Sequence, residues 1–139
     1  MTDSEAVLAA NRTFYRAFAA RDIAAIEALW ARRAPVACIH PGWPALVGRD
    51  AVVESWRGIM GNPASPNISC HDEEVLLYGD TALVLCREEL DGGTLIASNF
   101  FVREDGEWRI AHHQAGQFAA RQAAIRDRDI PVPPRSRLN

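Results

Sequence analysis

Histidine and glutamate side chains in this chain could support acid–base chemistry. His112 lies in the last strand-like segment, WRIAHHQAG, and His40 ends an earlier one. Imidazole exchanges protons near neutral pH, and a carboxylate within hydrogen-bond reach orients it for general acid–base catalysis. The strand register that the turns predict brings Glu88 to the same face as His112. We therefore expect His112, His40 and Glu88 to be the catalytic residues, with a hydrogen-bonded structural role for each as the alternative.

Aromatic rings surround a sharp turn in the segment CIHPGWPALVGRDAVVESW, residues 38–56. Trp43 lies in the turn, and Trp56 lies in the helix expected after it. A polar group beside aromatic walls is typical of a small-molecule pocket. We therefore expect Trp43 and Trp56 to contact a small apolar or mixed-polarity ligand. Cys38 and His40 share one face of a strand, which permits a nucleophile–base pair.

A metal site is an alternative for the same residues. His40, His112 and Glu88 would form a set of three ligands that suits zinc. Nothing in the spacing requires a metal, and the adjacent His112 and His113 point to opposite faces of a strand. We therefore expect no metal. No glycine-rich dinucleotide loop follows a strand, so no cofactor is indicated.

The composition narrows the class of protein. The chain has 139 residues, a formal net charge of -3 and no lysine. This length suits one domain with its own core, and the lack of lysine excludes a Schiff base. The acidic balance argues against nucleic acid as a partner. No apolar run is long enough to span a membrane, and the first residues lack the features of a signal peptide, so we expect a cytoplasmic protein.

Apolar spacing predicts three helices, followed by strands. A capping box of Thr2 and Glu5 starts the first helix, and Asp22 caps the second. The third helix is expected over residues 49–60. From Ile68 onward, turn residues separate strand-like runs, so an antiparallel meander follows the helices. This order is typical of an α+β fold.

The expected domain covers residues 1–120. Residues 121–139 are expected to form a partly irregular C-terminal extension, with a short helix over 119–128.

Three hairpin turns set the expected strand register: Gly79-Asp80, Gly92-Gly93 and Asp105-Gly106. Two-residue turns at these places pair Val75 with Val84, Cys86 with Asn99, and Asn99 with His112. Side chains alternate along a strand, so one face collects polar residues at one end. These residues are His71, Glu73, Glu88, Asn99, His112 and Gln114.

The opposite face of the expected sheet is apolar. It carries Leu83, Leu85, Ile96, Phe100 and Val102, with His113 beside Ser98. Such a face is too apolar for water, so we expect a homodimer that forms through the sheet. A single β-bulge would exchange the two faces beyond it.

These motifs resemble the nuclear-transport-factor-2-like (NTF2-like) superfamily, in its SnoaL-like branch. The resemblance rests on HPGWPALVGRDAVVESW, on ASNFFVREDGEWRIAHHQAG and on the order of helices and strands, and it covers residues 3–118. It implies a cone-shaped α+β fold, in which a strongly curved, mainly antiparallel sheet wraps around the helices and a cavity opens at one end. It also implies that the first strand lies beside the last, which brings His40 near the His112–His113 pair.

The superfamily includes isomerases, dehydratases, epoxide hydrolases, polyketide cyclases and assembly domains, so the fold leaves the function open. We expect a small-molecule-binding protein whose cavity is lined by Trp43, Trp56, Asn99, Phe101, Tyr15 and Gln114. One alternative is a cofactor-independent dehydratase, isomerase or cyclase that uses histidine acid–base chemistry. Another is a non-catalytic dimeric assembly domain.

Two of these residues have specific expected roles. In an isomerase-like site, Tyr15 on the first helix would donate a hydrogen bond to an oxyanion, although VACIH and LIASNFF offer no carboxylate base. Asn99, whose amide is costly to bury without partners, either ties the sheet to the HPGWP loop or orients a ligand.

Overall fold

The computed structural model describes residues 1–118 and 124–129. Three helices come first in the chain: α1 (Asp3–Ala19), α2 (Ile23–Leu29) and α3 (Arg49–Gly61). Two short strands, β1 (Ala37–Ile39) and β2 (Leu46–Val47), precede α3. Four long strands follow, β3 (Ser69–Tyr78), β4 (Thr81–Leu90), β5 (Gly93–Glu104) and β6 (Glu107–Gln117), and a 3-10 turn spans Asp127–Asp129. The helix expected over 119–128 lies partly outside the described residues.

Local capping signals determine where the first two helices begin. The capping box of α1 is present, because Thr2 accepts a hydrogen bond from the backbone of Glu5 and Glu5 accepts one from Thr2. The Asp22 side chain accepts a hydrogen bond from the backbone of Ala25 at 3.1 Å and caps α2. Both caps satisfy backbone N–H groups that the first helical turn leaves without partners.

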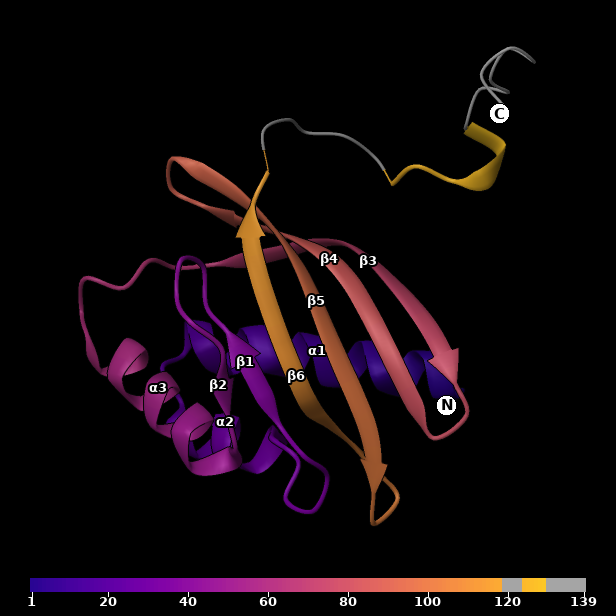
Figure 1. The fold of residues 1–139 in the computed structure, drawn as a ribbon, viewed down its shortest axis with the longest axis horizontal. Coiled ribbons are helices and arrows are strands. Elements are labelled where there is room, and N and C mark those ends of the chain that lie inside the picture. The colour runs from indigo at the N-terminus through magenta and orange to yellow at the C-terminus, as the bar shows by residue number, and fades with distance from the viewer. Residues whose placement is uncertain (119–123, 130–139) are drawn as a thin grey trace, which may run out of the picture.

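The six strands form one sheet in the order β2-β1-β6-β5-β4-β3. β1 pairs with β6 in parallel, and every other pairing is antiparallel. Figure 1 shows α1 crossing behind the curved sheet, with α2 and α3 beside β1 and β2. The first strand therefore lies next to the last, as expected, and Cys38 is opposite His113. The arrangement confirms a cone-shaped α+β fold.

Two bulges change the register that the turns predict. In β6, Ile110 pairs with Phe101 but His112 pairs with Phe100, so Ala111 is an extra residue. Beyond this point every side chain of β6 exchanges faces, because side chains alternate along a strand. Asn99 therefore pairs with His113, and the expected pairing of Asn99 with His112 is wrong.

The second bulge lies in β3, where the register shifts between His71 and Glu74. Asp72 adopts a positive φ of 56° there. His71 consequently pairs with Arg87 rather than with Glu88, and its imidazole lies near Glu89 on the outer side of the sheet. The side chain of Glu73 faces α1, where it contacts Asn11.

The turn between β4 and β5 also differs from the expected one. Leu90 pairs with Gly93, so the two turn residues are Asp91 and Gly92. This correction moves the pairing by two positions, so the side chains keep their faces and Asn99 lies opposite Val84. The pairing of Val75 with Val84 is confirmed.

A carboxylate anchors the loop that leads into β1. The two oxygens of Glu104 accept hydrogen bonds from the backbone N–H groups of Arg32, Arg33 and Ala34, each at 2.9 Å. This loop joins α2 to the sheet, so the anchor holds the segment that carries His40. Within the described residues, no helix is long and apolar enough to cross a membrane.

Candidate functional site

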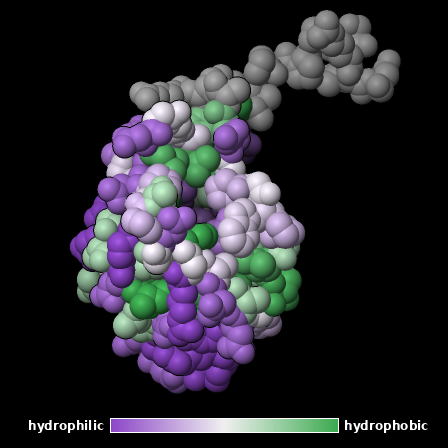
Figure 2. Space-filling model, turned by 90° about the vertical axis from the view of Figure 1, so that its left-hand side faces the viewer, coloured by the Kyte–Doolittle hydropathy of each residue, from purple (hydrophilic) through white to green (hydrophobic). Residues whose placement is uncertain are grey.

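A pocket of about 580 Å³ opens between the helices and the end of the β4–β5 hairpin. α1 and α3 supply Phe18, Trp56 and Ile59, and the hairpin supplies Leu90 and Leu95. Hydrophobic side chains form several patches on the α3 side of the molecule, one of them near its upper end at the height of this hairpin, whereas the lowest part is hydrophilic (Figure 2). The pocket has the aromatic and aliphatic walls typical of small-molecule sites.

Aromatic rings enclose the two imidazoles of the pocket. The His40 ring lies 4.9 Å from Trp43 and 4.7 Å from Trp56, both edge to face. The His113 ring lies 5.5 Å from Trp56 and 5.3 Å from Phe14. These indole and phenyl groups keep water from the imidazoles, and desolvation disfavours their charged forms.

One wall of the pocket carries a buried carboxyl group. Glu88 is 2% exposed, and its Oε2 accepts a hydrogen bond from the Tyr15 hydroxyl at 2.6 Å. Burial raises the pKa of Glu88, although the Tyr15 hydrogen bond acts against this shift. Burial and the nearby Glu88 together raise the pKa of Tyr15 well above its usual value, so Tyr15 keeps its proton and remains a donor.

His113 is the histidine that faces Glu88. Its Nε2 lies 3.9 Å from Oε2 of Glu88, and its Nδ1 lies 2.5 Å from the carbonyl oxygen of Asn99. Burial, followed by the proximity of His40 and His112, lowers the pKa of His113 to about 3. The imidazole is therefore neutral at pH 7. Its Nδ1 proton is donated to Asn99, which leaves the lone pair on Nε2.

His40 is held in a different way. Its Nε2 is 2.9 Å from the hydroxyl of Ser55, which donates its own proton to the backbone oxygen of Val52 at 2.6 Å. The hydroxyl must therefore accept the proton of His40 Nε2, which makes Nδ1 the basic nitrogen. Burial lowers the pKa of His40 to about 4, so this ring is also neutral.

The expected Cys38–His40 pair has little nucleophilic character. The two side chains do meet, with Sγ of Cys38 3.7 Å from Nε2 of His40. Burial raises the pKa of Cys38 to about 12, so the group is a thiol and not the reactive thiolate.

The structure brings together some of the expected site residues and separates others. His40, Trp43, Trp56 and Glu88 line the pocket. Tyr15 and Asn99 lie behind the polar wall, where they hydrogen-bond to Glu88 and His113, and Phe101 is buried in the core. Asn99 contacts α1 and β6 rather than the HPGWP loop.

The bulge in β6 places His112 and Gln114 on the other side of the sheet, so their expected places beside Glu88 and Asn99 are corrected. Gln114 is exposed, and His112 is half-buried. His113 takes the position that was expected for His112. The alternative metal set of His40, His112 and Glu88 is therefore separated, and the described residues contain no group of three side chains suited to a metal.

Asn11 was not among the site residues expected from the sequence, and the structure shows that it is completely buried. Asn11 lies in the apolar stripe of α1, between Val7 and Phe14 at helical spacing, and its polarity there was a usable signal. His113 gave no comparable signal, because adjacent histidines look alike until the bulge at Ala111 is known.

Comparisons with known proteins agree with the cone-shaped fold. A family model described as a SnoaL-like domain matches residues 7–120. A solved structure from Streptomyces avermitilis, described as a candidate dehydratase of the NTF2-like family, is 35% identical, with a TM-score of 0.77 over 85% of this chain and 97% of that one.

A second structure, from Thiobacillus denitrificans, is described as a candidate association domain of a calcium/calmodulin-dependent protein kinase type II. It is 32% identical, with a TM-score of 0.71 over 80% of this chain and 94% of that one. The F-box protein SKIP8 from Arabidopsis thaliana is 25% identical over 81% of this chain, which spans 49% of that longer protein. With the family match over most of its length, the chain belongs to the SnoaL-like family of the NTF2-like superfamily.

Proposed function

We propose that the protein binds a small, uncharged molecule in the pocket and exchanges protons with it through Glu88 and His113. The observation that carries this proposal is a buried carboxyl beside a buried imidazole, with Oε2 and Nε2 3.9 Å apart. Burial raises the pKa of Glu88 and lowers that of His113 to about 3, so both groups shift toward their neutral forms. A neutral carboxyl can give a proton, and a neutral imidazole can take one.

These two groups suit reactions that pass through an enol. Nε2 of His113 would remove a proton from the carbon next to a carbonyl group, and Glu88 would give its proton to the carbonyl oxygen. In an isomerisation, protonated His113 returns the proton to a different carbon while the enol O–H returns its proton to Glu88. In a dehydration, protonated His113 gives its proton to a β-hydroxyl group, which leaves as water, and the enol O–H again returns its proton to Glu88. The similarity to a candidate dehydratase supports the second outcome.

The charge of the pocket favours an uncharged ligand. Among the described residues that line it there is no arginine, and its acidic side chains are Glu88 and Asp91. A carboxylate or phosphate would lose its hydration there without gaining a cationic partner, which is costly. The Trp43 and Trp56 rings favour a flat, apolar body with a single carbonyl or hydroxyl group.

A pair of ligands with the same ring system tests this choice. At tenfold above its dissociation constant, 2-naphthol should raise the melting temperature by about 5 °C. The anion 2-naphthoate should leave it unchanged, because the described residues that line the pocket include no arginine to receive the carboxylate. Differential scanning fluorimetry measures both, and Trp43→Ala, at a side chain that is 46% exposed, should weaken the response to 2-naphthol. Equal stabilisation by the two compounds would contradict the proposed ligand class.

We also propose that two copies of the chain pack through the outer face of the sheet, and the similarity to a candidate association domain supports this. Ile96 is 49% exposed on that face, next to the half-buried Leu85, Phe100 and Val102. Ile96→Arg should halve the molar mass measured by light scattering, because a charge buried in an apolar interface lacks a partner. Val47→Arg, at the exposed edge strand β2, is the matched control. A wild-type monomer would contradict this proposal.

A further inference from the structure

A chain of buried amides connects β3 to the imidazole of His113. Oε2 of Glu73 accepts a hydrogen bond from Nδ2 of Asn11 at 2.9 Å. Oδ1 of Asn11 accepts one from Nδ2 of Asn99 at 2.8 Å, and Oδ1 of Asn99 lies 2.5 Å from Nδ1 of His113. Both asparagines are 0% exposed, so water does not compete for these bonds.

The chain of hydrogen bonds has a single consistent direction. An ionised carboxylate only accepts hydrogen bonds, so Glu73 requires the amino group of Asn11 to face it. The carbonyl of Asn11 then faces Asn99, whose amino group must turn toward it. The carbonyl of Asn99 is left for His113, which must therefore carry its proton on Nδ1.

A second contact favours the same orientation. The other proton of Asn99 Nδ2 is donated to the Tyr15 hydroxyl at 3.1 Å, and Tyr15 donates to Glu88. If Asn99 were turned over, its amino group would lose both acceptors. The second proton of Asn11 Nδ2 is donated to Sγ of Cys70 at 3.7 Å, so the donors and acceptors of both amides are matched, which gives a buried polar network its rigidity.

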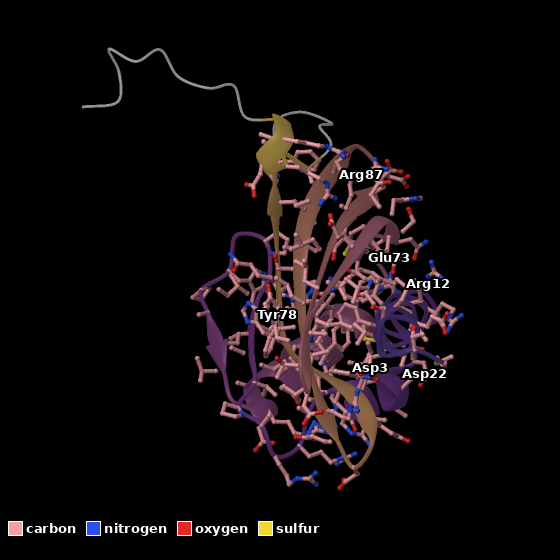
Figure 3. All side chains as sticks on the ribbon, turned by 90° about the vertical axis from the view of Figure 1, so that its right-hand side faces the viewer. Asp3, Arg12, Asp22, Glu73, Tyr78 and Arg87 are labelled. Carbon is pink, nitrogen blue, oxygen red and sulfur yellow. The ribbon has the colours of Figure 1, made fainter. Side chains whose placement is uncertain are left out.

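We propose that Glu73 is a positioning residue that fixes the tautomer of His113 through Asn11 and Asn99. The inference rests on the proposed function for its purpose, since the fixed tautomer keeps the lone pair on Nε2, the atom that faces Glu88. Glu73 itself lies outside the pocket, where β3 passes α1. It pairs there with Arg12, at 3.3 Å (Figure 3).

The alternation of side chains along β3 places Glu73 toward α1. Asp72 and Glu73 together oppose a single residue of β4, because His71 pairs with Arg87 and Glu74 with Leu85. The bulge turns His71 outward but leaves Glu73 on the same face as Val75, whereas the adjacent Glu74 faces outward and pairs with Arg126. The two neighbouring glutamates therefore form a natural pair of test and control.

Nitrogen-15 NMR of the imidazole rings tests the proposal directly in the unliganded protein. In the wild type, Nδ1 of His113 should show the shift of a protonated nitrogen and Nε2 that of an unprotonated one. Glu73→Leu frees Asn11 to turn over, so the spectrum should change to a mixture of both tautomers. Glu74→Leu should leave the spectrum as in the wild type. An unchanged His113 spectrum in Glu73→Leu would overturn the proposal.

A rescue experiment tests the direction of the chain. In Asn99→Asp, the carbonyl of Asn11 faces a carboxylate, and turning Asn11 over would place the same carbonyl against Glu73. This variant should therefore melt at a lower temperature than the wild type. Adding Glu73→Gln should restore part of the loss, because the new side-chain amide can donate to Asn11 and let Asn11 donate to the carboxylate introduced at position 99. If the decreases in melting temperature of the two single variants simply add in the double variant, the proposed direction of the hydrogen bonds is contradicted.

These results separate this inference from the proposed function. The tautomer and the melting temperatures are measured without ligand or turnover. If His113 responds to Glu73 but no proton exchange with a ligand is found, only the proposed function fails. If proton exchange is found while the tautomer ignores Glu73, only the positioning role fails.

Discussion

Glu88→Gln should lower the protein-dependent exchange of the α-protons of 2-tetralone for deuterium by about 10²- to 10³-fold. 2-Tetralone is a flat, uncharged ketone, and its α-protons exchange through the enol that the proposed chemistry requires. Glutamine keeps the size of the side chain and can still accept a hydrogen bond from Tyr15. It has no carboxyl proton to give to the ketone oxygen, so the enol loses its acid catalyst. Proton NMR in deuterium oxide, corrected for the buffer-catalysed rate, measures the effect.

The next residue of β4 provides a matched control. Glu89 lies on the outer side of the sheet, where it pairs with Arg87, so Glu89→Gln makes the same chemical change away from the pocket. This control should exchange at the wild-type rate. His113→Gln should lose as much as Glu88→Gln, because it removes the base. Equal rates for Glu88→Gln and the wild type would remove Glu88 from the chemistry.

The elements that could be predicted from the sequence are those that local interactions determine. The capping box at Thr2 and the cap at Asp22 are signals within one turn, and they place the starts of α1 and α2 correctly. The hairpin turns at Gly79 and Gly106 require positive φ, which glycine adopts readily, and both turns are where they were expected. The pairing of β1 with β6 was expected only from the family resemblance, because no local sequence pattern encodes a parallel pairing.

The histidine assignment failed because one extra residue reverses the faces of a strand. Ile110 and Ala111 are adjacent and both buried, which regular alternation forbids and a bulge permits. The sequence AHHQ suits either face, so only the three-dimensional register identifies His113 as the interior residue. Glu88 was placed correctly because β4 has no bulge and its residues alternate in burial from Ala82 to Glu88.

The contacts of Asn99 show a second limit of prediction. Its burial beside phenylalanines indicated a need for partners, but the partners come from α1 and β6, far away in the chain. The packing of α1 across the sheet decides which of several distant polar residues contacts the buried amide of Asn99. The pattern indicated that a network must exist, whereas the fold decides its members.

Acidification from pH 7 to pH 5 should lower the free energy of unfolding by roughly 2 kcal/mol through His113 alone. The pKa of His113 is about 3 in the folded protein, below the usual value of 6.5, because the ring is buried. Between these values the unfolded chain binds a proton that the folded protein refuses, so stability falls as pH falls. The contribution is complete above pH 6.5. His40, with a pKa of about 4, acts in the same direction.

Variants assign this acid sensitivity to its residues. In urea titrations at pH 7 and pH 5, His113→Gln should lose less stability on acidification than the wild type, because one proton fewer is taken up on unfolding. His71→Gln, at a half-exposed side chain on β3, should behave like the wild type. Glu88→Gln should become more acid-sensitive, since the raised pKa of Glu88 makes the folded protein bind protons more readily than the unfolded chain. Equal losses of stability in His113→Gln and the wild type would show that the fold does not lower the pKa of His113, which would contradict its burial as a neutral base.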